Sequence, residues 1–473
     1  MGTNENNMKK VKEPSFGFAL LSLLGSVAFI IVGTLVSKAT LHMMFLLTWL
    51  IVFAVGIYLG HSFESLENGA YDMIKTALQP IMILLAVGAM VGTWIASGTV
   101  PSIIYYGLKL INPKIFLLLT LLLCSITSLA TGTSWGTIGT AGLAMVGIGM
   151  GMGINPGLVA GAAVSGSYFG DKLSPLSDST ILAAAVAKTN IVDHIKHMLW
   201  TVTPGYIISA ILYLILGMKY AGANLDYNRI NEILVAMENN FNIGFLPFIP
   251  AIVVIVLLAS KKPAFPSILI GAIIGSIIAV FYQGQTVSSM LNIMYNGFKI
   301  DSGTPFLDTI LNRGGVTSMR DNTNMMICAF GFSGILRTAG ILDAIIKPLT
   351  KRIKSVFGLV FATFCVNWSF LATGATMSFA SVMTGTLLEP VYRKWRLKPQ
   401  NLSRAIEDFG TMGGPLIPYG ANALYISGMF GIAPMTFIPF CFLNIIVPII
   451  SLTYAFFGFT MYKYKDDEVV PEA

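Results

Sequence analysis

The stretch Gly170–Thr180, with the sequence GDKLSPLSDST, is the feature that most restricts how this chain can fold. It contains three charged side chains, three serines, a threonine and a proline, and apolar sequence lies on both sides of it. Charged groups at membrane depth are costly and usually functional, and Pro175 removes a backbone donor and disfavours helix just before it. We therefore predict that this stretch is the unwound middle of a broken transmembrane helix, buried by protein or reached by water.

The composition also indicates a membrane protein. Apolar residues make up 55% of the 473 residues and charged residues only 11%, and the mean hydropathy is +0.75; in soluble domains about a quarter of the residues are charged. The net charge of +7 comes from basic residues in short loops between apolar runs, so we expect no nucleic-acid partner. The four cysteines lie in apolar segments without paired spacing, which predicts free buried thiols. We expect no cleavable signal peptide.

Apolar runs long enough to cross a bilayer recur along the chain. We expect spans at 16–36, 42–60, 78–100, 115–130, 137–153, a broken 156–189, 201–219, 243–260, 264–283, 323–342, 355–372, 376–389, a broken 405–432 and 435–461. The segments 61–77, 221–242 and 284–322 are too polar to cross, and we expect 61–77 to lie at the membrane interface. The predicted fold is an all-α polytopic membrane protein with about 12–14 transmembrane segments, some of them replaceable by re-entrant hairpins.

Orientation follows from the basic residues of the short loops, which concentrate on the cytoplasmic side. With the N-terminus inside, the loops around 261–262, 347–354 and 393–398 all lie in the cytoplasm, and the acidic loop 226–238 lies outside. We therefore expect a multi-pass protein of the cell membrane with both termini in the cytoplasm.

The chain also repeats itself. The tetrapeptide Leu129–Gly132 recurs at Leu371–Gly374, and glycines and prolines match at nearly the same spacing, so that 84–182 corresponds to 326–425. The charge pattern makes the two copies cross in opposite directions, which predicts inverted-topology repeats with broken helices around a midplane site, as in secondary transporters. The expected division of the chain is 1–77 (N-terminal spans and interfacial segment), 78–200 (first repeat), 201–322 (connecting spans and polar linker), 323–432 (second repeat) and 433–473 (last span and tail).

Each repeat supplies two breaks that are rich in oxygen atoms. Sodium binds carboxylates, hydroxyls and unwound backbone carbonyls, whereas no Cys/His cluster is present for a transition metal. The candidate cation- or substrate-binding residues are Thr131, Gly132, Thr133, Ser134, Asp171, Ser174, Ser177, Asp178, Ser179, Thr373, Gly374, Thr376 and Asn422. Among them, the expected Na⁺ ligands are Asp171, Asp178, Thr131 and Thr373.

Asp178 is the carboxylate that we expect to exchange a proton for a cation, because the apolar half-helix after it removes it from water. Its alternative role is to cap the helix that begins near Ser179. Asp171 is the next candidate, and its alternative role is an ion pair with Lys172 or with an arginine elsewhere.

Four further polar residues receive structural interpretations. We read Glu407 and Asp408, which follow the basic loop 391–404, as charges placed favourably near a helix N-terminus with basic neighbours. The pair His194 and His197 is expected to form an interfacial face.

The motifs Thr131–Thr137 (TGTSWGT), Gly170–Thr180 and Gly414–Asn422 (GPLIPYGAN) resemble those of the NhaC family of sodium/proton antiporters, part of a wider ion-transporter superfamily. The resemblance implies an alternating-access carrier in the lipid bilayer, a homodimer with a moving transport domain, and no cofactor besides the transported Na⁺ and H⁺. The same family includes carriers that exchange malate for lactate with Na⁺ and H⁺, so a small carboxylate remains the alternative substrate. The polar sites lack an obvious paired-arginine clamp for a dicarboxylate, which favours the inorganic cation. A membrane-embedded hydrolase is a more distant alternative that predicts no inverted repeat, and we expect no enzymatic activity.

Overall fold

The computed structural model describes residues 11–468, except 37–38, 111, 176, 222–226, 261, 305–306, 309–310, 352, 373–375 and 466. Regular structure in this part of the chain is helical, apart from an isolated antiparallel bridge between Leu397 and Lys463. The prediction of an all-α polytopic membrane protein is therefore confirmed.

Ten α-helices lie in the described part of the N-terminal half. They are α1 (Phe16–Val36), α2 (Leu41–Tyr58), α3 (Phe63–Ala96), α4 (Thr99–Leu110), α5 (Phe116–Thr131), α6 (Ser134–Thr137), α7 (Leu143–Gly151), α8 (Pro156–Leu173), α9 (Asp178–Val186) and α10 (Ile191–Ala221). A π-helical turn at Ile138–Gly142 joins α6 to α7, so that 134–151 is one nearly continuous helix.

The connecting region and the C-terminal half are also helical. Their helices are α11 (Tyr227–Asn240), α12 (Ile249–Ala259), α13 (Ala264–Gln283), α14 (Val287–Asn296), α16 (Arg320–Thr338), α17 (Ile341–Lys351), α18 (Val356–Ala372), α19 (Met377–Lys394), α20 (Pro399–Ile406), α21 (Ala421–Phe430), α22 (Pro434–Phe437) and α23 (Phe442–Phe457). A π-helical turn at Glu407–Thr411 follows α20 directly.

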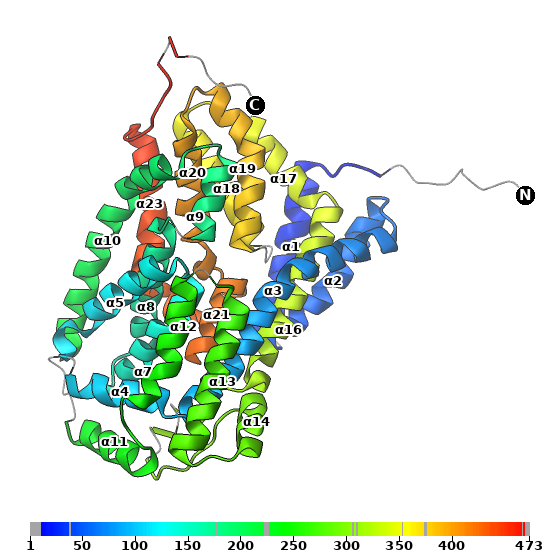
Figure 1. Cartoon of the computed structure of the whole chain (residues 1–473). Helices are drawn as coiled ribbons and strands as arrows, with labels where there is room; N and C mark the ends of the chain where they lie inside the picture. Colours follow the sequence, from blue (N-terminus) through cyan, green and yellow to red (C-terminus); the bar gives the residue numbers. More distant parts are fainter. Residues whose placement is uncertain are drawn as a thin grey trace, which may run out of the picture.

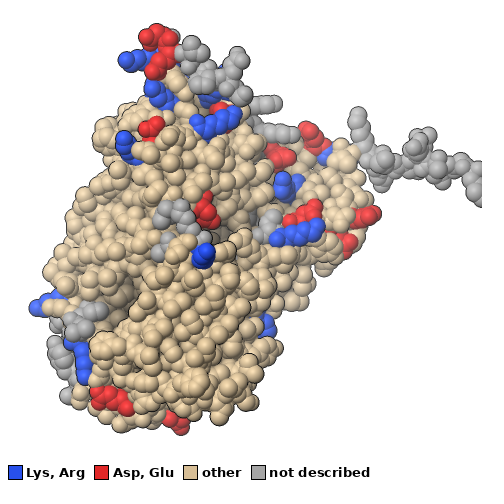
Figure 2. Space-filling model, viewed as in Figure 1, with Lys and Arg blue, Asp and Glu red and all other residues tan. Residues whose placement is uncertain are grey.

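The surface has the distribution of charge that a bilayer requires. In Figure 2 most charged side chains lie at the upper end, on the upper right and at the lower end of the molecule, and the face between them is largely uncharged apart from a few scattered groups. Large apolar side chains are exposed on several helices, including Leu21 of α1, Leu50 of α2, Ile126 of α5 and Phe281 of α13. Lipid contact accounts for this exposed apolar surface, which water would disfavour.

Five helices are long and apolar enough to cross a membrane on their own, among the residues that the structure describes: 16–34, 77–96, 113–131, 191–219 and 264–282. A bent pair, 421–430 with 434–440, makes a sixth candidate, with 88° between its two parts. The apolar helices 42–58, 246–258, 356–372 and 442–457 are shorter. The count of 12–14 segments therefore stays a prediction.

Two expected boundaries are wrong. The acidic segment 61–77 is continuous with the span that follows it, because 63–77 forms the first part of the 34-residue helix α3, whose N-terminus is capped by Ser62; its position at the membrane interface stays a prediction. The pieces around His194 and 201–219 likewise form one helix, α10, which continues through Pro204. In both helices the side chains change from polar to apolar along the axis, whereas the backbone stays helical.

The order of elements repeats at the spacing seen in the sequence. Helix α5 ends at the first TG motif and α18 ends just before the second, while α8–α9 and α20–α21 are both interrupted helices. In Figure 1, α4 and α7 lie at the lower end of the molecule, whereas α17 and α19 lie at the upper end. This arrangement supports two inverted copies, which we propose as the organisation of the chain.

Close packing of α8 on α5 fixes the position of the first break. A Cβ atom added to Gly166 would lie 2.4 Å from the carbonyl oxygen of Leu121, and one added to Gly170 would lie 2.3 Å from the backbone nitrogen of Leu129. Only glycine permits this approach, as is common where membrane helices pack closely. The residue that follows Gly170, Asp171, is thereby held against the end of α5.

Candidate cation site

A cavity of about 480 Å³ lies where the broken helices meet. Residues of both proposed repeats line it, together with residues from α3 and from the turn between α12 and α13. The lining residues are Gln79, Ile83, Thr131, Gly132, Thr133, Ser134, Trp135, Asp171, Asp178, Leu258, Lys262, Pro263, Ala264, Phe265, Thr376, Met377, Ser378, Ala421 and Asn422.

Asp171 is the buried carboxylate of this cavity, with an exposed fraction of 1%. Ser134 Oγ donates a hydrogen bond to its Oδ2 at 2.7 Å, and Ser177 Oγ donates one to its Oδ1 at 2.7 Å. In the described part of the chain, no Lys, Arg or His forms an ion pair with it. The expected alternative, a pair between Asp171 and Lys172, is wrong, because the Lys172 ammonium binds Asp408.

The break after α8 is built by hydroxyl groups. Thr180 Oγ1 donates to the carbonyls of Asp171 and Lys172, at 3.0 Å each. Ser174 Oγ donates to the carbonyl of Leu129 at 3.0 Å, which ties the break to the end of α5. Carbonyls at the end of a helix have no partner within the helix, so these bonds stabilise an interruption that lipid would not tolerate.

Asp178 differs from Asp171 in its surroundings. Its side chain is exposed to the cavity, and its Oδ1 accepts a hydrogen bond from the backbone nitrogen of Ser179 at 3.1 Å. The premise that Asp178 is poorly hydrated is therefore wrong, since the more buried carboxylate is Asp171. Sequence alone did not distinguish them, because Pro175 and the apolar half-helix adjoin both residues.

The other predicted residues fall into three groups. Thr131, Gly132, Thr133, Ser134, Thr376 and Asn422 line the cavity with the two aspartates. Ser174, Ser177 and Ser179 are buried in the break behind it. Thr373 and Gly374 lie outside the described residues. The described residues contain no group of three or more His, Cys, Asp and Glu side chains able to hold a metal ion, so the candidate ligands are one or two carboxylates with hydroxyls and carbonyls.

Several described helices begin at the cavity, among them α9, α13, α19 and α21. The N-terminus of α19 is capped by the hydroxyl of Thr376, whereas α9 and α21 have no side-chain cap. Helix N-termini carry partial positive charge and unsatisfied N–H groups, and the side chain of Lys262 adds a full positive charge. The cavity therefore presents both a carboxylate for cations and several groups that favour anions.

Sequence reasoning did not assign Gln79, Lys262 and Ser378 to the site. Gln79 lies in the middle of α3, and its polarity within an apolar span was the available signal. Lys262 lies in the short turn between two spans, where it was read only as a marker of orientation.

A second polar cluster is buried behind the cavity. Lys172 Nζ lies 2.9 Å from Asp408 Oδ1, and Arg404 Nε lies 3.7 Å from Asp408 Oδ2, with all three side chains at most 1% exposed. Thr201 Oγ1 also donates to Asp408 at 2.9 Å. The expected basic neighbours of Asp408 are confirmed, but its interpretation as a charge that interacts with a helix N-terminus is wrong, because it is a buried ion-pair partner of Lys172 and Arg404.

Other residues around this cluster are also buried, contrary to expectation. Glu407 is 1% exposed and begins the π-helical turn. His194 and His197 are both buried rather than interfacial, and the ring of His197 lies between the carbonyls of Gln400 and Thr460, at 2.9 Å from each. A buried lysine requires an acidic partner, so the position of Lys172 within an apolar span indicated that an acidic residue such as Asp408 lies beside it.

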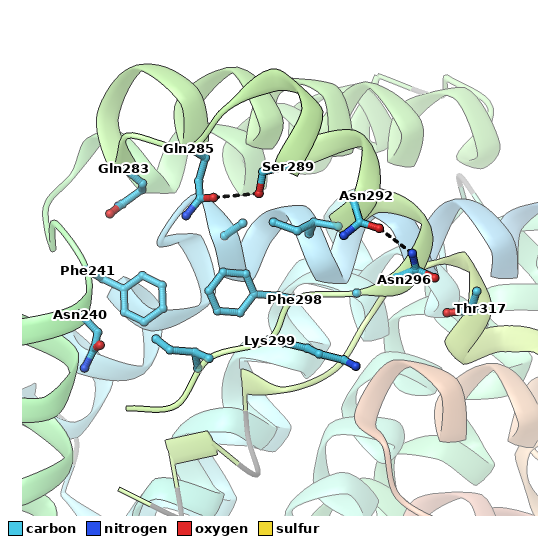
Figure 3. Close-up of a pocket in the computed structure, with 14 residues that line it drawn as sticks. Asn240, Phe241, Gln283, Gln285, Ser289, Asn292, Asn296, Phe298, Lys299 and Thr317 are labelled. Atoms are coloured by element: carbon cyan, nitrogen blue, oxygen red, sulfur yellow. Dashed lines mark hydrogen bonds between the residues drawn. The ribbon is translucent and has the colours of Figure 1, made fainter. Parts of the chain in front are cut away.

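Another cavity, of about 730 Å³, lies near the ends of α13 and α14 (Figure 3). Its polar groups are mainly amides that bond to their neighbours, as Gln285 does to Ser289 and Asn296 does to Asn292. None of the described residues that line it is Asp or Glu. This cavity therefore offers no carboxylate to a cation.

Comparison with known proteins places these features in a family. A family model described as the Na⁺/H⁺ antiporter family matches residues 166–459. Over 98% of its length, the chain is 40% identical to the malate-2H(+)/Na(+)-lactate antiporter of Bacillus subtilis (strain 168), of which it covers 99%. Over 94% of its length, it is 34% identical to the Na(+)/H(+) antiporter NhaC of Alkalihalophilus pseudofirmus, of which it covers 96%. The arginine/ornithine antiporter ArcD of Halobacterium salinarum is 30% identical over 98% of the chain and 96% of that protein.

Proposed function

On the premise that the chain belongs to the Na⁺/H⁺ antiporter family and is a secondary antiporter of a membrane, we propose that it exchanges Na⁺ for H⁺, and that Asp171 binds either ion. The observation that carries this proposal is the environment of Asp171. It is a buried carboxylate with two hydroxyl partners and no basic partner among the described residues, and it lies at the cavity where both proposed repeats meet.

The proposed exchange follows from the cost of burying a charge. An ionised carboxylate in an apolar interior is strongly disfavoured unless something neutralises it. A proton neutralises Asp171 directly, and Na⁺ neutralises it when nearby oxygens complete its coordination. Ser134 and Ser177 suit both states, because a hydroxyl is a donor to a bare carboxylate and an acceptor toward a cation.

Further ligands are proposed from the cavity lining and from the sequence. Thr131 lies at the end of α5 beside the cavity, Asp178 faces it from the start of α9, and Thr373 follows α18 at the matching position of the second repeat. Asp178 has a different role from Asp171, since its exposed carboxylate attracts cations into the cavity before they reach the buried site.

Transport requires that the site open to one side at a time. A carrier that changes conformation readily only when Asp171 is neutralised exchanges the two ions and does not leak either. We propose alternating access by relative movement of the two inverted repeats, with both termini in the cytoplasm and two copies of the chain in the cell membrane.

Exchange of small carboxylates is the second candidate function. The helix N-termini at the cavity and the side chain of Lys262 favour an anion, and the 40% identical relative is named for malate and lactate. In this case Na⁺ on Asp171 and a carboxylate near the N-termini of α9 and α21 occupy the cavity together.

Reconstitution into liposomes separates the two candidates. A Na⁺ gradient is imposed, and internal pH is followed with a trapped dye, with and without malate and lactate. Proton flux without any carboxylate supports Na⁺/H⁺ exchange, and flux that requires a carboxylate supports the second candidate. Absence of coupled flux under both conditions contradicts both.

A further inference from the structure

We propose that Glu407 is a second proton-binding residue, which releases its proton when Na⁺ binds beside Asp171. This inference rests on the proposed exchange of Na⁺ for H⁺ and adds a second titratable group to it. The proton leaves as H⁺ to the water on the open side, and no other bond is made or broken.

The first observation is that Glu407 is buried without a full set of partners. Its side chain is 1% exposed, and its Oε2 has no hydrogen-bond partner among the described residues. Glu407 and the next residue, Asp408, both belong to the π-helical turn Glu407–Thr411, and both side chains are buried. Such turns are rare and often occur at functional sites.

The second observation is that the neighbouring basic side chains already bind Asp408. Lys172 Nζ lies 2.9 Å and Arg404 Nε 3.7 Å from its carboxylate. Arg404 Nη1 donates to Thr460 Oγ1 at 2.8 Å. Within the described chain Glu407 therefore has no ion-pair partner of its own, and a buried carboxyl group without one binds a proton rather than remain charged.

The third observation links Glu407 to the cation site. Glu407 directly precedes Asp408, Asp408 binds Lys172 at 2.9 Å, and Lys172 directly follows Asp171, so this ion pair connects the surroundings of Glu407 to those of the cation site. When Na⁺ binds to ionised Asp171, it cancels a negative charge close to this ion pair, which lowers the free-energy cost of ionising Glu407. Coupling of this kind is reciprocal, so release of the proton from Glu407 strengthens Na⁺ binding to the same extent.

The other titratable groups near this turn have partners or different surroundings. On the helices packed around the turn and α20 they are Asp171 and Lys172 on α8, Asp178 on α9, His194 and His197 on α10, Cys365 on α18, Glu389, Tyr392, Arg393 and Lys394 on α19, Arg404 on α20 and Tyr454 on α23. Glu389 pairs with Lys188 and Arg393, at 3.6 Å and 3.9 Å. Asp178 is exposed to the cavity, so among the described residues near Lys172 the buried acids without an ion pair are Asp171 and Glu407.

The test is the pH dependence of Na⁺ binding to the purified full-length protein, measured with radioactive ²²Na⁺. The slope of log Kd against pH equals the number of protons released per Na⁺ bound, by linkage. We expect Glu407→Gln to bind Na⁺ with a slope lower by about one proton per Na⁺ than the wild type. The matched control is Glu389→Gln, which removes a largely buried but salt-bridged glutamate and should keep the wild-type slope.

A wild-type slope in Glu407→Gln overturns the inference. An infrared difference spectrum provides a second measurement: adding Na⁺ to the wild type should remove protonated carboxyl bands of both Asp171 and Glu407, and Glu407→Asp should shift the glutamic acid band to the frequency of an aspartic acid. A wild-type difference spectrum without a glutamic acid band, or one that Glu407→Asp leaves unchanged, also overturns the inference, and this holds even if the Gln variant fails to fold. If Asp171→Asn retains Na⁺ binding, the proposed function fails instead, whatever the Glu407 variants do.

Discussion

The ammonium of Lys172 lies 2.9 Å from a carboxylate oxygen of Asp408, and both side chains are completely buried. Lys172 follows Asp171 directly in the chain, yet the two residues have separate partners: Asp171 binds serines and Lys172 binds an aspartate from the second proposed repeat. This separation leaves Asp171 available to a proton or a cation. The ion pair between Lys172 and Asp408 also connects the first broken helix to the second.

Breaking the ion pair should destabilise the protein strongly. Asp408→Asn leaves the charges of Lys172 and Arg404 buried without their carboxylate, and losing one partner of a buried pair costs about 3–5 kcal/mol. Lys172→Met should cost less, because Arg404 still neutralises Asp408. Thermal unfolding of the purified variants checks this order. Equal stability of Asp408→Asn and the wild type would show that the pair contributes nothing.

Ser134 should contribute to Na⁺ affinity through its bond to Asp171. Ser134→Ala removes one oxygen with little change in shape, and a hydrogen bond to a charged group contributes about 1.5–3 kcal/mol, so we expect about a tenfold or greater rise in the Kd for Na⁺. The control is Ser369→Ala on α18, whose hydroxyl bonds only its own helix at the carbonyl of Cys365. An unchanged Kd in Ser134→Ala would contradict a role for this hydroxyl.

Asp178→Asn should reduce transport without abolishing it. Because Asp178 is exposed to the cavity, we expect a raised apparent KM for Na⁺ at low ionic strength and a smaller difference at high salt, where surface charges are screened. Transport assays at two ionic strengths, with choline as the added cation, measure this. Complete loss of exchange at both would restore Asp178 to the coupling role that its sequence context suggested.

Gly170→Ala should displace the first break. An added Cβ would lie 2.3 Å from the backbone nitrogen of Leu129, so α8 must move away from α5, and overpacking of this kind costs about 1–3 kcal/mol. We expect lower thermal stability together with weaker Na⁺ binding. Gly25→Ala on α1 is the control, since nothing lies within 4 Å of its Cβ position. Wild-type stability and affinity in Gly170→Ala would show that this contact does not set the position of Asp171.

Much of the fold could be predicted from the sequence because membrane helices must satisfy their own backbone and face lipid with apolar side chains. The span 16–36 coincides with α1, and the broken helix at Gly170–Thr180 was predicted from its charges and Pro175. The continuity of 61–77 with the next span could not be predicted from hydropathy, because α3 continues through a polar first half. Hydropathy reports what surrounds a residue, and it does not report whether the backbone hydrogen bonds continue.

The site was predictable only in part. The motifs identified the residues that line the cavity, since an unwound segment with hydroxyls and carboxylates has few other uses in a membrane. The order of burial of Asp171 and Asp178 and the partner of Lys172 were not predictable, because both depend on contacts with Ser134 and Asp408, which are 37 and 236 residues away in the chain.

The central claim is that Asp171 is the residue that binds either Na⁺ or H⁺, and Asp171→Asn in liposomes tests it most directly. The change keeps the size of the side chain and removes its charge, while Asp193→Asn, an exposed aspartate near the start of α10, serves as the control. We predict that the Asp171→Asn protein folds and inserts but shows no proton flux driven by a Na⁺ gradient, and that Asp193→Asn behaves as the wild type. Proton flux near the wild-type rate in folded Asp171→Asn would contradict the claim.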